Sequence, residues 1–472
     1  LEQIEKMEVH YLASAEGELN FALVSDWADA DQQTCAGDSD LLAVAAGGIA
    51  ALNRRYAPGV AGPRFILLHR YRVFNEPDQL WMGWERKRGK LHELNRLLRG
   101  ATDTTFIMDD SQQAKDSGFQ FVPADVRYVI ALDADTQLPR NTAARLIGKM
   151  AHPLNRPVFS SSEQRVIDGY AILQPRITPS LPTGNDGSYF QRVFSSPGGI
   201  DPYAAAISDV YQDLFEEGSF TGKGIYDVDL FEASLAGRIP DNSVLSHDLF
   251  EGTFARAGLA TDVEFIEDFP ARYDVAGKRQ HRWTRGDWQL LPWIMGRVAE
   301  EQSLPSVGRW KMIDNLRRAL LAPSTLAALI LCLLLPVPGN FVGVGLVIIA
   351  IAAPNFLTGL FSLLPDRAGI CLGHHLRSLV SDFNRACAHS LLNLIFLSDT
   401  AWRMGDAIIR TLSRVFFTRR RLLEWTTAAQ TNSCPRPNYL GFYKQMAGGV
   451  FLAFFLTLVV IALAPAGWPL SV

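Results

Sequence analysis

The chain has 472 residues and a formal net charge of −4, so it is long enough for one large or two medium domains. This charge balance excludes a strongly basic nucleic-acid-binding protein, and we expect no nucleic acid among the partners. Five cysteines, at positions 35, 332, 371, 387 and 434, form no Cys-x-x-Cys pair, which argues against a zinc site or a disulfide framework and fits a reducing compartment. The chain begins at Leu1 without a signal-peptide pattern, so we expect a fragment of a longer protein.

Residues 1–312 are expected to form an α/β domain. Short apolar runs with strand character alternate there with charged helical stretches, at residues 21–24, 64–68, 128–132 and 171–173. This alternation is typical of a layered α/β domain.

Residues 313–472 are expected to form a membrane region. Two nearly uncharged apolar stretches, 319–335 and 341–364, are separated by Pro and Gly residues at 336–340 and predict a transmembrane hairpin at about 319–364. A third stretch, 447–464, predicts another spanning helix. The first stretch is short and contains Pro323, so a buried core helix is the alternative there.

The segment 366–446 is basic, with ten arginines and one lysine. The positive-inside rule places such a segment in the cytoplasm, and residues 1–312 then lie on the same side. Apolar residues recur within it at helical spacing beside arginines: Leu376, Leu379, Val380, Phe383, Leu391, Leu394 and Ile395. They predict a helix in the membrane interface, with an amphipathic helix packed on the domain as the alternative.

Two carboxylates, Asp133 and Asp135, follow the apolar run 128–132. Residues i and i+2 of a strand project to the same face, so both carboxylates are expected to reach one divalent cation that carries a diphosphate. A solvated turn or a helix cap is the alternative. Upstream, Asp26 closes another strand run, and Lys87 lies in a basic, glycine-containing stretch as a diphosphate site requires, although such stretches are often simply solvated.

Asp248 follows a turn-forming sequence at 241–243 and lies at an expected helix start beside His247. A carboxylate there is suited to accept the proton of an attacking sugar hydroxyl, and capping of the helix by Ser246 or Asp248 is the alternative. At helical spacing, Arg279, Arg282 and Trp283 share a face, with guanidinium groups for phosphate oxygens and an indole for a sugar ring. A core tryptophan and solvated arginines are the alternative.

The ordered series of aspartate, Asp-x-Asp, aspartate and Arg-Trp before apolar helices resembles the membrane-bound processive glycosyltransferases, which include cellulose, chitin and hyaluronan synthases. The resemblance implies a GT-A-type, Rossmann-like domain followed by transmembrane helices. It assigns Asp26 and Lys87 to the nucleotide, Asp133 and Asp135 to Mg²⁺ or Mn²⁺ with the diphosphate, and Asp248 to the base. Arg279, Arg282 and Trp283 then cover the diphosphate and the acceptor end, although the motif departs from the family because glutamine stands at 280 and not at 279.

Longer strings, at 8–12, 220–228, 280–289 and 422–425, resemble the glycosyltransferase region of cyclic β-1,2-glucan synthases. These are large, multi-pass proteins of the bacterial inner membrane, in which further membrane segments precede this region and a phosphorylase-like module follows it. The resemblance places residues 220–228 near the acceptor, with Gly222 and Gly224 for close approach and Lys223 or Tyr226 for hydroxyl groups, where a plain glycine-rich turn is the alternative.

The resemblance implies inverting transfer of glucose from UDP-glucose to a growing β-1,2-glucan chain, with the lipid bilayer as a further partner. A synthase of another β-glucan and a lipid glycosyltransferase are alternatives within the class. Outside it, an inactive membrane scaffold and a metal phosphohydrolase are alternatives, which the Arg-Trp motif beside membrane spans disfavours.

Overall fold

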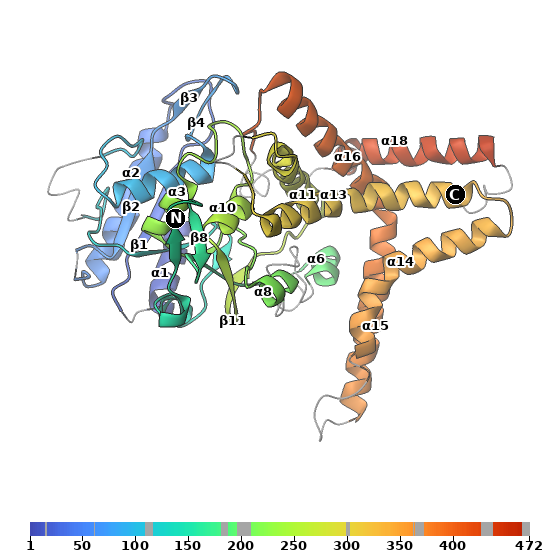
Figure 1. Ribbon diagram of the computed structural model, residues 1–472, viewed down its shortest axis with the longest axis horizontal. Helices are drawn as coiled ribbons and strands as arrows, with labels where there is room; N and C mark the ends of the chain where they lie inside the picture. Colours follow the sequence, from blue (N-terminus) through green and yellow to red (C-terminus); the bar gives the residue numbers. More distant parts are fainter. Residues whose placement is uncertain are drawn as a thin grey trace.

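The structure is a computed structural model that describes residues 1–14, 17–60, 62–108, 117–180, 187–195, 209–298, 303–361, 363, 372–425 and 438–464. It has an α/β half and a helical half, and the long helices of the latter project to one side in Figure 1. Cys35, Cys332 and Cys387 are free thiols, and Cys371 and Cys434 lie outside the described residues.

The first part of the α/β half contains α1 (Glu2–Ala13), β1 (Phe21–Asp26), α2 (Asp38–Arg55), β2 (Phe65–Arg70), β3 (Val73–Asn75), β4 (Leu80–Met82) and α3 (Arg86–Leu97). The second part contains β5 (Tyr128–Ala131), β6 (Thr136–Gln137), α5 (Thr142–Met150), η1 (Pro153–Asn155), β7 (Val158–Ser160), β8 (Arg165–Asp168), β9 (Ile172–Pro179), α6 (Tyr189–Phe194) and α8 (Val210–Phe215). It continues with β10 (Gly224–Asp227), α9 (Val228–Leu235), α10 (Asp248–Phe254), β11 (Ala257–Glu267), α11 (Tyr273–Gln289) and α12 (Leu291–Ile294).

Strands β1 and β2 form a parallel pair with helices on both faces. Side chains of β2 alternate, so that Phe65 and Leu67 pack against α1 and α2 while Ile66 and Leu68 pack against α3. All six residues of β2 are buried, as expected for a strand covered on both faces.

The larger sheet has five strands in the order β5-β10-β9-β11-β6. Strand β9 runs parallel to β11 and antiparallel to β10, so the sheet is mixed. Alternation again divides the core: Leu173 and Ile225 face α5, and Ile172 and Tyr226 face α9. The expected α/β class is confirmed, but the described strands of β1–β2 and of the larger sheet form separate hydrogen-bonded sheets.

The helical half contains α13 (Ser306–Leu333), α14 (Gly339–Phe361), α15 (Leu372–Ile395), α16 (Leu397–Ser413), the π-helix η3 (Arg414–Thr418) and α18 (Tyr439–Leu463). Three of these helices, α13, α14 and α18, are long and apolar enough to cross a membrane. The 28 residues of α13 extend about 42 Å at the helical rise, so the helix is longer than the hydrocarbon core, and Pro323 lies inside it without ending it.

Helix α15 contains the apolar residues predicted at helical spacing, and it runs across the direction of α13 and α18 in Figure 1. Leu376, Val380, Phe383, Leu391 and Ile395 are exposed, so this face does not pack on the α/β half. The orientation and the exposed apolar face fit a helix at a membrane surface.

Helix α16 connects the two halves. It packs against α11 and α13, with hydrogen bonds from Tyr273 Oη to Asp399 Oδ2 at 2.7 Å and between His281 Nε2 and Asp406 Oδ2 at 2.8 Å. Helix α16, the central part of the basic segment, is therefore joined directly to the α/β half.

A buried ion triad links β1, β2 and α3. The fully buried Arg70 donates from Nε to Asp26 Oδ1 at 2.6 Å and from Nη1 to Glu93 Oε2 at 2.8 Å. Glu93 also accepts hydrogen bonds from the main-chain N–H and the hydroxyl of Thr105. Removal of one charge would leave a buried arginine without its full compensation.

We expect Glu93→Gln to lower the free energy of unfolding by about 3–5 kcal/mol, because breaking a buried pair leaves an uncompensated charge. Thermal unfolding in detergent checks this, with Glu163→Gln as the control, since that carboxylate forms an exposed pair with Arg165. The control substitution should lower the free energy of unfolding by only about 0–1 kcal/mol. Equal effects of the two substitutions would contradict the prediction.

Candidate active site

Asp133 and Asp135 lie just beyond β5, in a turn and not in the strand itself. The turn is closed by a hydrogen bond from the N–H of Thr136 to the carbonyl of Asp133 at 3.0 Å. Strand alternation therefore does not orient the two carboxylates, and that expectation was wrong. Helix α1 holds the turn instead, because Lys6 Nζ donates to the carbonyl of Ala134 at 2.7 Å.

Asp133 lies between two lysines. Lys87 Nζ is 2.5 Å from Asp133 Oδ1, and Lys223 Nζ is 3.4 Å from Oδ2. Burial alone would raise the pKa of Asp133, but Lys87 and Lys223 outweigh it and hold the pKa below its ordinary range. Asp133 is thus a half-buried carboxylate that stays ionised.

Lys87 belongs to the first turn of α3 and not to a loop. Its ammonium also donates to the carbonyl of Gly222 at 2.7 Å, so it joins α3 to the segment before β10. The same helix turn carries Arg86, which pairs with Asp29, and Lys90, which pairs with Asp26. Cations at the positive end of a helix dipole form a favourable place for an anion.

Asp26 ends β1 and is held by Arg70 and by Lys90, whose Nζ is 2.8 Å from Asp26 Oδ2. Burial would raise the pKa of Asp26, but these two cations keep it below its ordinary value. The carboxylate is ionised and lines the same cavity as Asp133.

Lys223 and Gly222 lie in the segment that leads into β10. Lys223 Nζ is 2.6 Å from Glu267 Oε2, and burial lowers the pKa of this lysine. Gly222 has a φ of +79°, and a Cβ there would lie 2.4 Å from Asp248 Oδ1. Only glycine meets both conditions, so the main chain closely approaches Asp248.

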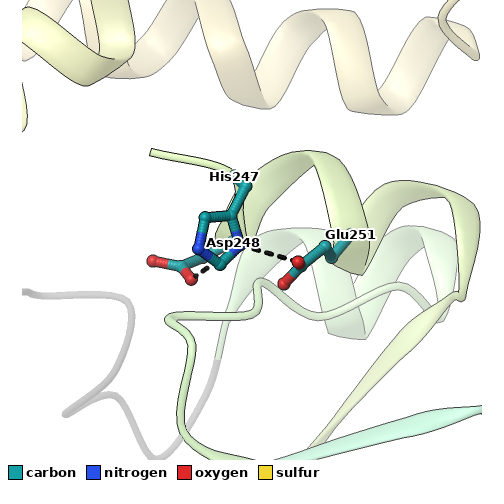
Figure 2. A group of neighbouring side chains, drawn as sticks. All are labelled: His247, Asp248 and Glu251. Atoms are coloured by element: carbon teal, nitrogen blue, oxygen red, sulfur yellow. Dashed lines mark hydrogen bonds and ion pairs between the residues drawn. The ribbon is translucent and has the colours of Figure 1, made fainter. Parts of the chain in front are cut away.

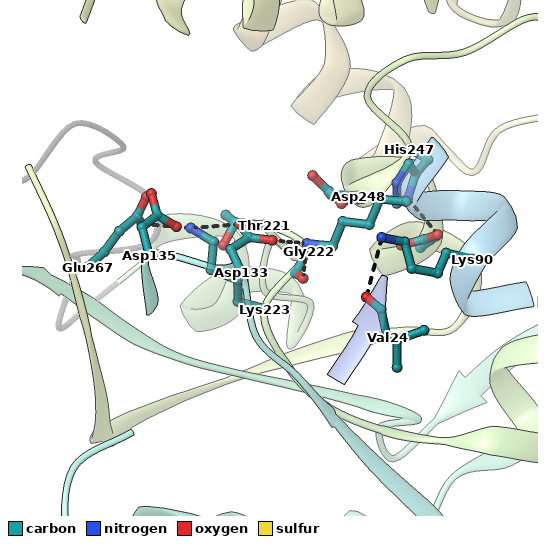
Figure 3. A network of polar contacts seen from close by, with 12 residues as sticks. Val24, Lys90, Asp133, Asp135, Thr221, Gly222, Lys223, His247, Asp248 and Glu267 are labelled. Atoms are coloured by element: carbon teal, nitrogen blue, oxygen red, sulfur yellow. Dashed lines mark hydrogen bonds and ion pairs between the residues drawn. The ribbon is translucent and has the colours of Figure 1, made fainter. Parts of the chain in front are cut away.

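Figure 3 shows Glu267, Asp135, Asp133, Gly222 and Asp248 in succession across the site.

Asp248 is the first residue of α10, and its side chain is 30% exposed. Neither Asp248 nor Ser246 caps this helix, whose N-cap is His247 without a side-chain hydrogen bond to the main chain. Among the described residues Asp248 Oδ1 has no hydrogen-bond partner. That oxygen is buried beside Gly222, so a ligand in the cavity that Asp248 lines can reach only the exposed part of the carboxylate.

His247 lies between Asp248 and Glu251, as Figure 2 shows. Its Nδ1 is 2.6 Å from Glu251 Oε1 and 3.6 Å from Asp248 Oδ1, and Glu251 is 1% exposed. Burial would lower the pKa of His247, but Glu251 and Asp248 outweigh it and raise the pKa above 6.5. The three side chains also bring potential ligand atoms within 4.8 Å of one another, although the histidine–glutamate hydrogen bond accounts for their proximity.

Helix α11 carries the Arg-Trp residues. Arg279 pairs with Glu267, lies 3.7 Å from Asp135 through its Nη1, and stacks on the ring of Trp283. Arg282 points to the same cavity, and burial with the neighbouring Arg279 lowers its pKa to about 10, so it stays charged at neutral pH. Gln280 is exposed on this helix.

The segment 422–425 returns to the site after η3. Trp425 lies against the guanidinium of Arg282 at 4.1 Å, and Glu424 pairs with Arg285 and Arg414. The main chain is held as well, since Arg86 donates to the carbonyl of Leu423 at 3.1 Å. These contacts bring a distant part of the sequence to α11 and α3.

Most of these groups line a cavity of about 2650 Å³. It extends from β1 and the Asp133 turn, past Asp248 and Arg282, to Asn315 on α13 and Trp402 on α16. The site therefore opens toward the helices that enter the membrane region.

The charges indicate which ligand fits. Three carboxylates and four cations converge: Asp133, Asp135 and Glu267, with Lys87, Lys223, Arg279 and Arg282. Carboxylate oxygens are the ligands that Mg²⁺ and Mn²⁺ prefer, but the surplus of cations disfavours a bare metal ion. A metal ion that arrives with a diphosphate brings the anionic oxygens that these cations require.

Glu267, Glu251 and Trp425 are the residues that sequence reasoning missed. The string at 422–425 contributes to the family resemblance but indicates no role for Trp425. No motif indicates Glu267 at the end of β11 or Glu251 one turn after His247.

The residues predicted for the site line the cavity except Gly222, Gly224 and Tyr226. Gly222 contacts Lys87 through its carbonyl. Tyr226 is fully buried and donates to Asn95, so the expectation that it is available to a sugar hydroxyl was wrong.

No protein-family model matches the chain. The chain is, however, 47% identical over 470 residues to the cyclic beta-(1,2)-glucan synthase NdvB of Rhizobium meliloti (strain 1021). This chain is homologous to one region of a cyclic β-(1,2)-glucan synthase. The match covers 99% of the chain and 16% of the length of that relative. The resemblance inferred from the motifs is thereby confirmed for nearly the whole chain.

In this glucan synthase homologue the His247–Glu251 pair should make stability depend on pH. A raised pKa in the folded state gives a stabilisation that is complete below about pH 6.5 and is lost as pH rises through the folded-state pKa. We expect Glu251→Gln to lower the free energy of unfolding by about 2 kcal/mol at pH 6 and by less at pH 9, as measured by thermal unfolding.

The matched control is Glu216→Gln, because the Glu216 carboxylate is 77% exposed. This substitution should change the free energy of unfolding little at either pH. A Glu251→Gln deficit that is the same at pH 6 and pH 9 would contradict the assignment of a charged His247.

Proposed function

We propose that this chain is the glycosyltransferase region of a cyclic β-1,2-glucan synthase and transfers glucose from UDP-glucose to a growing β-1,2-glucan chain. The observation that carries the proposal is the position of Asp248. Its carboxylate is 30% exposed and lines the same cavity as Asp133 and the surrounding cations. The homology to a named glucan synthase supports the same reaction class.

The donor half of the site lies between α3, the Asp133 turn and α11. Asp26 is suited to bind the nucleoside, while Lys87, Arg279 and Arg282 are suited to bind the diphosphate. Asp133 and Asp135 would hold Mg²⁺ or Mn²⁺, and the bound ion supplies a Lewis acid that stabilises the charge of the leaving diphosphate. The β1–β2 unit and the larger sheet then correspond to a GT-A-type domain.

The acceptor half lies around Asp248. Asp248 removes the proton from the 2-hydroxyl of the terminal glucose, and that oxygen forms a bond to C1 of the donor glucose. The bond between C1 and the diphosphate oxygen breaks at the same time, and UDP leaves with the electron pair. One base and direct displacement invert the configuration at C1. Trp283 offers a flat face for a sugar ring, and Lys223 and Gly222 fix the main chain beside the acceptor.

The product chain grows by repeated transfer, so the enzyme is processive in this proposal. Helices α13, α14 and α18 span the bacterial inner membrane, and the basic segment with the α/β half faces the cytoplasm. In the full-length protein, further membrane helices and a phosphorylase-like module would complete the path of the glucan and control its length.

We expect Asp248→Asn to lower glucose transfer by about 10²–10⁴-fold, because general-base help is lost, while UDP-glucose binding stays near the wild-type value. Incorporation of radiolabelled glucose by membranes that contain the full-length protein measures transfer, and Asp241→Asn, an exposed aspartate just before α10, is the control. Normal transfer by Asp248→Asn would show that another group is the base.

We expect Mn²⁺ and UDP to bind cooperatively, each raising the affinity of the other by about tenfold, because the cations around Asp133 oppose a bare metal ion. Titration calorimetry with and without UDP measures this coupling, and chelation of the metal should abolish transfer.

Asp135→Asn should remove the coupling, whereas Asp168→Asn, at a carboxylate 78% exposed, should leave it intact. Equal Mn²⁺ affinity of the wild-type protein with and without UDP is the result that would contradict this assignment.

A further inference from the structure

The first turns of α13 lie inside the α/β half and carry a buried lysine. Lys311 is 3% exposed, and its Nζ donates to the main-chain carbonyls of Glu217 and Gly218 at 2.8 and 2.7 Å. The ammonium also lies over the ring of Tyr211. Burial of a lysine costs free energy unless hydrogen bonds satisfy it, so this position calls for an explanation.

The two carbonyls begin the segment 217–223, which carries Gly222 and Lys223 into the site. Its later residues are each held by a separate element: Thr221 donates from N and Oγ1 to Gln174 on β9, Lys87 on α3 donates to the carbonyl of Gly222, and Lys223 pairs with Glu267 on β11. Lys311 fixes the start of the segment to α13 in the same way.

Close packing joins the same elements. A Cβ at Gly308 would lie 2.4 Å from the side chain of Thr253, so α13 packs directly on α10, the helix that begins with Asp248. A Cβ at Gly252 on α10 would lie 2.7 Å from Phe220 in the segment. With the 2.4 Å approach of the Gly222 position to Asp248, these contacts leave little freedom between the segment and Asp248.

We infer that Lys311 is a positioning residue for glucose transfer, which holds the segment 217–223 against α10 so that the acceptor hydroxyl meets Asp248. This inference rests on the proposed function. Lys311 acts through the main chain of residues 217 and 218, and it belongs to the helix that continues into the membrane region. The position of the first turns of α13 therefore determines the orientation of the acceptor.

The cavity supports this role. Lys311 and Asn315 line it from α13, and Thr221 and Lys223 line it from the segment. Because Lys311 joins them, α13 and the segment form one continuous wall of this cavity. A small displacement of this wall changes the orientation of the attacking hydroxyl more than the binding of the donor.

The test uses Lys311→Met in the full-length protein reconstituted in lipid nanodiscs, with radiolabelled UDP-glucose and Mn²⁺. We expect kcat for glucose incorporation to fall by about 10- to 100-fold. The KM for UDP-glucose and the binding of UDP with Mn²⁺ should stay within about twofold of wild type, since Lys311 touches none of the donor-binding groups. The share of UDP released without glucose incorporation should rise, because water replaces a misplaced acceptor.

Two further variants complete the design. Arg309→Met removes a charge from the same turn of α13 at an exposed position and should behave as wild type. Lys311→Arg keeps the donors and should restore most of the incorporation rate.

Unchanged incorporation by Lys311→Met would overturn the inference, and so would loss of UDP binding together with incorporation, since that marks a merely structural residue. If the wild-type protein makes no glucan while it still binds UDP with Mn²⁺, the proposed function fails and not this inference alone.

Discussion

The structure depends on one electrostatic constraint, the half-buried carboxylate of Asp133 and the cations that keep it ionised. A carboxylate that is partly withdrawn from water needs hydrogen bonds and opposite charges to compensate it. Lys87 and Lys223 provide this, and each is fixed by a second contact, to the carbonyl of Gly222 and to Glu267. The helix α3, the segment before β10 and the end of β11 are thereby held around a single group.

The same constraint explains the ligand that the site favours. Cations exceed carboxylates in this part of the cavity, and the N-terminus of α3 adds its dipole to them. A diphosphate with a divalent metal ion satisfies both kinds of group at once, whereas either component alone leaves charges uncompensated. Asp248 lies outside this paired cluster and next to His247, and its side chain, 30% exposed, lines the cavity where a second, neutral substrate can meet it.

Much of this arrangement follows from the sequence. The apolar runs at 21–24, 64–68 and 128–132 mark β1, β2 and β5, because a strand between two layers of helices must be apolar on both faces. The residues that the acidic and Arg-Trp motifs predict for the site line one cavity. The apolar helices were recognisable from their length, although α13 begins well before its apolar stretch, inside the α/β half.

The remainder depends on contacts between distant residues, which local patterns do not encode. The turn at Asp133 looks like a continued strand because Ala134 and Asp135 keep the alternating pattern, and only α1 packed against it reveals the turn. Glu267 and Trp425 are ordinary residues in their own segments and become part of the site when β11 and residues 422–425 reach α11. Lys311 reads as the polar start of a membrane helix, and its buried position follows from the packing of α13 on α10.

Linkage analysis of the product is the measurement that tests the central claim most directly. The full-length protein in membranes is supplied with radiolabelled UDP-glucose and Mg²⁺ or Mn²⁺, and the polymer is methylated and hydrolysed to identify its linkages. The account predicts a β-1,2-linked glucan that Asp248→Asn membranes do not make. A glucan of another linkage, a glucosylated lipid, or UDP release without any glucoside product would contradict it.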